Sequence, residues 1–143
     1  MSTFRIAACQ MNSQDDKAAN LATAERLIGE AAALGAQMVG LPEMFNFLTV
    51  DEKMADGAEP LDGPTAQFLQ GKAKQHGIYL HGGSIPTLIP DSARVYNTTL
   101  VFDPTGEQIA SYNKIHLFDI HVEGQSSYKE STPGGAGQRD GHL

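Results

Sequence analysis

Two helical segments that alternate with short apolar runs constrain the fold of this chain more than any other feature. In residues 17–34 the apolar positions recur at helical spacing, and Gly35 follows where a left-handed helix cap would lie. A second helix is predicted over residues 64–76, because Pro64 suits the first helical turn and Gly77 ends the pattern. The apolar runs around these helices are too short for further helices, and we expect strands there: residues 4–10, 37–41 and 78–85.

The second half of the chain predicts a β-hairpin. Residues 97–102 and 108–112 favour strands, and Asp103-Pro-Thr-Gly106 between them supplies turn residues. Within the preceding predicted strand, the pair Gly82-Gly83 allows another backbone or side chain to come close. Residues 45–61 have a mixed pattern and are expected to be loop with some helix. The predicted order of elements indicates a mixed α/β fold whose helices cover one face of a sheet.

Charge and composition exclude several classes of protein. Among 143 residues, 17 acidic and 10 basic side chains give a net charge of −7, and the basic residues are scattered, so nucleic acid is not an expected partner. The apolar runs are too short to span a bilayer, and the first residues lack the apolar length of a signal peptide. We therefore expect a cytoplasmic protein with no membrane contact and one folded domain.

Disulfide and metal chemistry are not expected either. The single cysteine, Cys9, excludes an intrachain disulfide and a cysteine-based zinc site. His116 and His121 lie five residues apart on a predicted loop and are expected to be solvated or hydrogen bonded rather than metal ligands. The other histidines show no ligand spacing: His76, His81 and His142. No cofactor is predicted.

Glu43 and Lys114 are the candidate catalytic residues. A strand that stops at Pro42 places Glu43 at its carboxyl end, since proline cannot donate to a continuing ladder. A carboxylate there can be partly desolvated, which raises its pKa toward a range useful for proton transfer. Taken alone, Glu43 would be a solvated loop residue and Lys114 a charge that discourages pairing at a hairpin edge. The motifs around them favour the catalytic interpretation.

Three separated strings match those of a known family in their order and intervals: Ala7-Ala-Cys-Gln-Met11, Leu41-Pro-Glu-Met-Phe45 and Tyr112-Asn-Lys-Ile-His-Leu-Phe-Asp119. Over residues 4 to about 133 the chain resembles the nitrilase superfamily of carbon–nitrogen hydrolases. Within it, the chain is most similar to the Nit subfamily of ω-amidases and deaminated glutathione amidases. The resemblance implies an α/β fold that is part of a four-layer α-β-β-α sandwich, incomplete in this chain, and a Cys-Glu-Lys active site.

The resemblance also implies a role for each site residue. A cysteine thiolate attacks the terminal amide of a small carboxylate-bearing substrate, Glu43 takes the thiol proton and returns one to the leaving amine, and Lys114 stabilises the oxyanion. A second glutamate of the family, which helps to hold the lysine and the substrate, matches Glu130 best. Glu123 is the alternative, and it ranks second because the Nit pattern usually has proline at that position. Without such a role, Glu130 would be a solvated loop carboxylate. The resemblance also makes a homo-oligomer like those of the family a possible state.

The nucleophile that the resemblance implies is not found after Lys114. Cys9 lies in the middle of a predicted strand and is expected to behave as a small buried hydrophobe. Residues 1–131 are interpreted as the amino-terminal part of a hydrolase domain, and the glycine-rich residues 132–143 as a disordered tail outside the family pattern. One hypothesis is that a frameshift or truncation produced this carboxyl end. We expect the chain alone to be inactive, with an uncovered sheet face that favours association.

Two other functions stay open at this point. A non-catalytic interaction or assembly module derived from the same fold would keep the surface without the catalysis. A flavodoxin-like binding domain is suggested by the strand–helix–strand–helix start, but it is disfavoured because no glycine-rich phosphate loop follows the first predicted strand.

Overall fold

The computed structural model describes residues 3–121, 123 and 128–137 of the chain. Two helices, one 3₁₀ helix and eight strands follow one another in this part of the sequence. They are β1 (Ile6–Ala8), α1 (Lys17–Ala33), β2 (Met38–Gly40), η1 (Asp51–Gly57), α2 (Pro64–His76), β3 (Tyr79–His81), β4 (Ile85–Leu88), β5 (Val95–Phe102), β6 (Gln108–Asn113), β7 (Asp119–Ile120) and β8 (Tyr128–Lys129).

Six of the strands form one mixed sheet. β1, β2 and β3 run parallel to one another, and β3 pairs antiparallel with β5. β4 pairs with residues 95–98 of β5, while β6 pairs with the other edge of β5 and closes the predicted hairpin. The predictions of a mixed α/β fold and of this hairpin are confirmed.

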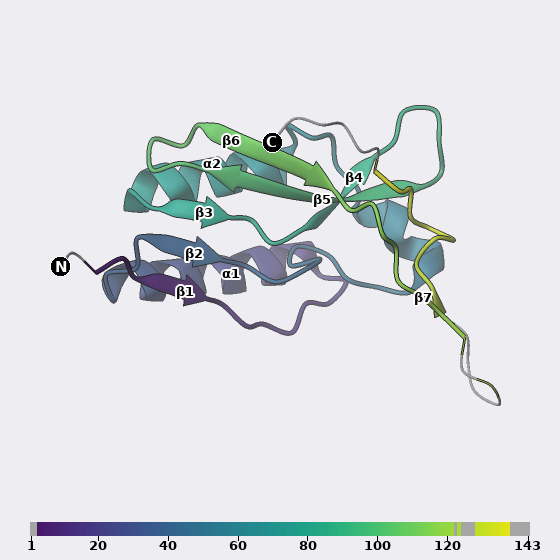
Figure 1. Ribbon diagram of the computed structural model, residues 1–143, viewed down its shortest axis with the longest axis horizontal. Helices are drawn as coiled ribbons and strands as arrows, with labels where there is room; N and C mark the ends of the chain where they lie inside the picture. Colours follow the sequence, from purple (N-terminus) through teal and green to yellow (C-terminus); the bar gives the residue numbers. More distant parts are fainter. Residues whose placement is uncertain (1–2, 122, 124–127, 138–143) are drawn as a thin grey trace.

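Both helices lie behind the sheet in the view of Figure 1 and cover the same face. α1 begins where the Asp16 side chain accepts a hydrogen bond from the backbone nitrogen of Ala19, and α2 begins at Pro64. Both ends match the sequence prediction, since Gly35 and Gly77 have the positive φ of a left-handed cap. Apolar side chains of the helices and strands fill the space between them and form the core: Ala24, Ile28, Val39, Leu69, Leu80 and Leu100.

A break after β3 divides what the sequence predicts as one strand over residues 78–85. β3 ends at His81, and Gly83 adopts a φ of +57° before β4 begins at Ile85. Leu80 is opposite Phe102, yet Ile85 is opposite Thr98, so the two halves pair with β5 in registers that differ by one residue. Because side chains alternate along a strand, this extra residue turns Ile85 into the core.

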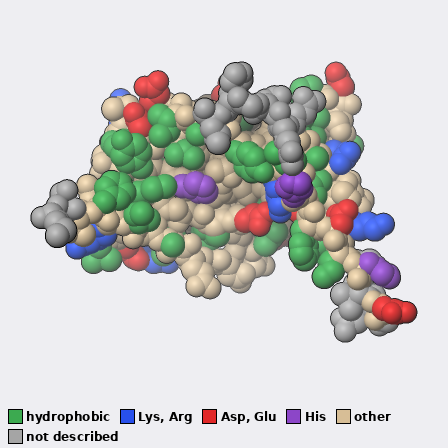
Figure 2. Space-filling view, viewed as in Figure 1, with side chains coloured by type: hydrophobic (Ala, Val, Ile, Leu, Met, Phe, Trp, Pro, Cys, Tyr) green, Lys and Arg blue, Asp and Glu red, His purple; other side chains and the backbone are tan. Residues whose placement is uncertain are grey.

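The opposite face of the sheet is open in the described part of the chain. Strand alternation puts Ile6, Met38, Tyr79, Val101 and Tyr112 on this face, and we call them the open face. Ile6 is 64% exposed, Tyr112 48% and Tyr79 40%. Hydrophobic side chains gather over these strands in Figure 2. The sheet therefore has one covered and one uncovered side.

The last described residues are hydrogen bonded, although the sequence predicts a disordered tail from residue 132. Val95 donates its backbone N–H to Pro133 and accepts from Gly135, while Gly137 donates to the carbonyl of Lys114. The first two bonds satisfy the backbone groups of Val95, which β6 does not reach, and the third satisfies the carbonyl of the residue after β6. Glycine permits this close approach, whereas the sequence prediction took the glycines as a sign of flexibility. Residues 138–143 lie outside the described part of the chain, so their predicted disorder and the frameshift or truncation hypothesis stay predictions.

None of the helices in the described residues is both long enough and apolar enough to cross a membrane.

Candidate active site

Glu43 lies in a tight loop that follows β2 and rests on the break between β3 and β4. The Ser84 backbone N–H donates to the carbonyl of Pro42 (3.3 Å), and its hydroxyl accepts from the backbone N–H of Met44 (3.0 Å). A Cβ on Gly83 would overlap the Pro42 carbonyl oxygen, so the predicted close approach at this glycine is confirmed. The loop thus fixes the backbone on both sides of Glu43.

Lys114 comes directly after β6, where the hairpin register brings it beside Asn97 of β5. Thr98 pairs with Asn113, and the next backbone N–H, that of Lys114, donates to the Asn97 carbonyl at 2.9 Å. Asn97 lies on the face of β5 opposite to Thr98, which packs toward β4 through its hydroxyl. The hairpin therefore sets Lys114 and Asn97 side by side.

Glu130 reaches the same place from the turn after β8. Its carboxylate Oε2 accepts the backbone N–H of Phe118 (2.6 Å), and its own N–H donates to the Phe118 carbonyl (3.2 Å). Next to it, the Asp119 carboxylate accepts from the backbone N–H and the hydroxyl of Ser131. These bonds hold the β7–β8 arm, which extends from the body of the molecule in Figure 1, so that Glu130 points inward.

These side chains meet in one cluster around the ammonium of Lys114. Its Nζ lies 3.0 Å from Oε1 of Glu43 and 2.9 Å from Oε2 of Glu130. The Asn97 amide donates to Oε1 of Glu43 at 2.7 Å and to Oε1 of Glu130 at 3.3 Å. The structure thus brings all three candidate residues of the sequence analysis together and adds Asn97 to them.

The charges in the cluster stabilise one another. Burial lowers the pKa of Lys114, but hydrogen bonds to the Glu130 and Glu43 carboxylates outweigh this effect, and the pKa is raised above its ordinary value. Burial likewise raises the pKa of Glu130, yet the donors Lys114, the Phe118 N–H and Asn97 hold that pKa below its ordinary value. At neutral pH the ammonium and the Glu130 carboxylate are both charged.

Glu43 is more exposed than the sequence analysis expected. Its side chain is 61% exposed, compared with 26% for Lys114 and 13% for Glu130. The Glu43 carboxylate is therefore mostly solvated in this chain, because the loop holds Glu43 at the rim of the sheet rather than beneath it.

Two pockets adjoin the cluster, and Glu43, Asn97 and Lys114 line both of them. The first has a volume of about 340 Å³ and is also lined by Glu130. Most of its remaining wall is apolar: Met44, Leu48, Met54, Val95, Phe118 and Tyr128. The second, of about 200 Å³, extends toward His81, Thr99 and Tyr112. A small molecule with an apolar stem and a polar end therefore fits the first pocket.

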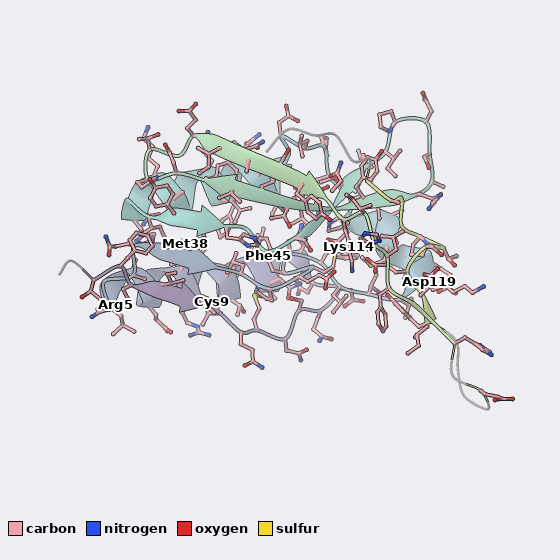
Figure 3. All side chains as sticks on the ribbon, in the orientation of Figure 1. Arg5, Cys9, Met38, Phe45, Lys114 and Asp119 are labelled. Atoms are coloured by element: carbon pink, nitrogen blue, oxygen red, sulfur yellow. The ribbon has the colours of Figure 1, made fainter. Side chains whose placement is uncertain are left out.

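Cys9 and Glu123 are not part of this cluster. Cys9 lies beside β1, well apart from Lys114 in Figure 3, and lines neither pocket. Burial, and then the negative charge of Glu30, raise the pKa of its thiol, which is the reverse of what an activated nucleophile needs. Glu123 is exposed in the turn beyond β7, so Glu130 is the glutamate that contacts Lys114.

Asn97 was not among the site residues predicted from the sequence. Asn97 is only 6% exposed in an otherwise apolar and β-branched strand, and a buried amide requires hydrogen-bond partners. That amide at the start of a predicted strand was the available signal. Among residues 3–121, 123 and 128–137, no group of three or more His, Cys, Asp or Glu side chains is arranged to hold a metal ion.

Comparison with known proteins assigns the chain and its fold to a class. The model of the carbon–nitrogen hydrolase family matches residues 5–142, and the chain belongs to this family. The matched range extends past residue 131, and the boundary between domain and tail at that position stays a prediction.

Within this family the chain falls in the Nit branch of the nitrilase superfamily. It is 44% identical to the omega-amidase NIT2 of Mus musculus over 131 residues, which is 92% of this chain and 47% of that protein. The Homo sapiens omega-amidase NIT2 is 43% identical over the same shares of the two chains. The chain thus spans about half the length of the curated relatives it matches.

Solved structures agree with this assignment. The C. elegans NitFhit protein superposes with a TM-score of 0.83 at 35% identity, over 96% of this chain and 34% of that one. An amidase from Nesterenkonia sp. gives a TM-score of 0.76 at 28% identity, over 95% of this chain and 49% of the amidase. The nitrilase-type α/β fold is therefore shared across most of this chain.

Proposed function

We propose that this chain supplies the general base and the oxyanion-binding lysine of an amidase that hydrolyses the terminal amide of a small carboxylate-bearing substrate. The observation that carries the proposal is the Lys114 ammonium held between Glu43 and Glu130 at 3.0 and 2.9 Å. Similarity to omega-amidases, at 44% identity to the mouse protein, supports the reaction and the substrate class.

In this mechanism a cysteine thiol, which the 143 residues do not supply near the cluster, gives its proton to Glu43 as the sulfur attacks the amide carbonyl. The proton then passes from Glu43 to the leaving amine, so that ammonia departs and a thioester remains for hydrolysis by water. Lys114 offers a fixed positive charge to the carbonyl oxygen while that oxygen carries negative charge. Glu130 keeps Lys114 charged and in place.

A non-catalytic interaction module is not favoured. Such a module has no need for an ammonium that two carboxylates hold within hydrogen-bonding distance beside a pocket, with an amide that donates to both carboxylates.

The test is release of ammonia from simple ω-amides, by the chain alone and after fusion to a family-like carboxyl half that carries a cysteine nucleophile. We expect turnover only in the fusion. Glu43→Gln should reduce kcat by roughly 10²–10⁴-fold, and Lys114→Met by roughly 10²–10³-fold. Glu130→Gln should lower the rate as well, because Glu130 keeps Lys114 charged and in place. Its matched control, Glu123→Gln, should leave the rate unchanged.

Two results would count against the proposal. Turnover by the chain alone would show that no outside nucleophile is needed. A folded fusion whose activity resists the Glu43→Gln substitution would remove Glu43 from the reaction.

A further inference from the structure

The amide of Asn97 is the neutral group that joins the two carboxylates of the cluster. Its Nδ2 donates to Glu43 at 2.7 Å and to Glu130 at 3.3 Å, so both of its N–H bonds can be used at once. The same residue accepts the backbone N–H of Lys114 at 2.9 Å. One buried residue of β5 therefore contacts every other member of the cluster.

Glu43 needs such support because its side chain is long and 61% exposed. An exposed ion pair alone fixes a glutamate weakly, since the solvated side chain regains rotamer freedom when the pair opens. In this site both donors, Lys114 and Asn97, meet the same oxygen, Oε1. In the residues that the structure describes, no hydrogen bond is formed to Oε2 of Glu43.

We propose that Asn97 is a positioning residue of this site, whose amide holds Oε1 of Glu43 against Lys114 and so leaves Oε2 as the oxygen that accepts the proton. In the proposed reaction the S–H bond of the nucleophile breaks, an O–H bond forms at Oε2, and the electron pair of the broken bond stays on sulfur. The assignment of this proton step rests on the proposed function. The hydrogen bonds that position Glu43 do not.

An amide suits this place better than a second cation. A lysine or arginine at position 97 would also donate to both carboxylates, but its charge would stabilise their ionised forms and weaken them as proton acceptors. An aspartate at position 97 would add a third carboxylate next to two others. Asparagine gives two hydrogen bonds without a charge, so Lys114 is the cation that both carboxylates share.

The test uses this chain, without turnover, and compares Asn97→Leu with Thr99→Val. Leucine matches the size of asparagine but cannot donate, whereas Thr99 lies two residues along the same face of β5 and makes no hydrogen bond to the carboxylates. NMR couplings report the χ1 and χ2 angles of Glu43. We expect one rotamer in the wild type and in Thr99→Val, and averaged rotamers in Asn97→Leu.

A second readout is the midpoint of the Glu130 carboxyl titration, followed through its side-chain carbon. The ionisable groups around Glu130 are Lys114, Glu43 and Asp119. We expect the midpoint to move upward in Asn97→Leu, because one donor to the ionised form is lost, and to stay unchanged in Thr99→Val. A Glu43 side chain that stays in one rotamer in a folded Asn97→Leu variant would overturn the proposal.

If Asn97→Leu does not fold, the wild-type chain provides the test of the positioning role. The side-chain N–H signals of Asn97 should shift with pH together with the Glu130 carboxyl carbon, since the Asn97 amide bonds to that carboxylate. Asn97 signals that stay constant while Glu130 titrates would refute the positioning role. These outcomes are independent of hydrolysis, so an inactive fusion would contradict the amidase and leave the Asn97 result standing.

Discussion

Lys114 carries the only positive charge among the cluster side chains, and this makes the cluster sensitive to acid and to base. The pKa of Glu130 is lowered in the folded chain, so its contribution to stability is present above the unfolded value of 4.5 and is lost as the pH falls through the lowered folded value. The pKa of Lys114 is raised, so its contribution is present below 10.5 and is lost as the pH rises through the raised folded value.

The first prediction concerns Glu130→Gln. The substitution should reduce the free energy of unfolding at pH 7 by roughly 1–2 kcal/mol, because it removes a charged acceptor from Lys114 and the Phe118 N–H. The variant should also lose less stability than the wild type between pH 5 and pH 3, as measured by urea unfolding. Parallel pH profiles for the two proteins would contradict the linkage.

A second ion pair, Lys17 with Glu59, supports the structure away from the site. The Glu59 side chain is 8% exposed, and Lys17 Nζ lies 2.5 Å from it. Burial raises the pKa of Glu59, but hydrogen bonds from Lys17 and from the backbone N–H and hydroxyl of Thr65 outweigh this effect. The pKa of Glu59 is therefore below its ordinary value, and the carboxylate is charged. Glu59 thereby accepts the backbone N–H of Thr65 in the first turn of α2, where the N-cap residue Gly63 has no side chain to accept it.

The second prediction is that Lys17→Met destabilises the chain by about 3 kcal/mol, because a buried carboxylate loses its partner. The matched control is Arg26→Met, which breaks an exposed pair with Glu30 and should cost about 0.5 kcal/mol or less. Thermal and urea unfolding measure both. Equal losses in the two variants would show that burial of Glu59 is not the cause.

At the residue scale, the sequence identified the charged members of the cluster but not their support. Glu43, Lys114 and Glu130 lie in recognisable strings, and the structure brings all three together. Asn97 was missed because its role depends on the hairpin register, which sets it beside Lys114. The exposure of Glu43 was also missed, since burial depends on what the neighbouring elements cover and not on Pro42 alone.

The helices and the hairpin are the elements that local sequence determines best. Helical spacing, Pro64 and the two glycine caps gave the extent of α1 and α2 to within a residue. β4 was missed as a separate strand because the predicted strand over residues 78–85 continues across Gly82-Gly83 and stops before Pro86, which lies within β4. β7 and β8 are two residues each and owe their pairing to the contacts of Glu130 and Asp119, which a local pattern does not encode.

The third prediction compares two glycine substitutions. Gly83→Ala should destabilise the chain by several kcal/mol and shift the loop of Glu43, because Gly83 has a φ of +57° and its Cβ would overlap the Pro42 carbonyl. Gly71→Ala, in the interior of α2 with open space around its Cβ, should stabilise the chain by roughly 0.5–1 kcal/mol. Melting temperatures and the amide signals of residues 42–45 report both effects. A Gly83→Ala variant with unchanged loop signals would contradict this account.

At the scale of the whole molecule, the open face departs from an ordinary globular surface. Five apolar or aromatic side chains on adjacent strands face away from both helices. An exposed apolar sheet face favours association with another surface. The order of elements allowed the prediction that the helices cover one face of the sheet, and the structure shows both helices on one face.

The fourth prediction is that the isolated chain self-associates through the open face. Ile6→Lys combined with Tyr79→Lys should shift the sedimentation profile toward the monomer and reduce binding of an apolar dye. Leu34→Lys is the control, since Leu34 is 71% exposed but follows α1 at the edge of the helical layer. A wild-type chain that sediments as a monomer and melts cooperatively would contradict the prediction.

The one-residue offset between β3 and β4 limits which changes in chain length the molecule can accept. Deleting one residue within 82–84 would place β4 in the register of β3 and remove the break between the two strands, while Ile85 would stay opposite Thr98. The same deletion would remove the support of the loop that holds Glu43. Insertions and deletions should accordingly be tolerated in the turn at residues 103–106 and rejected at residues 82–84, although both segments are short, glycine-containing connections. Deletion scanning would show that the distance along the chain between Leu80 and Ile85 is as constrained as the identity of any side chain in the cluster.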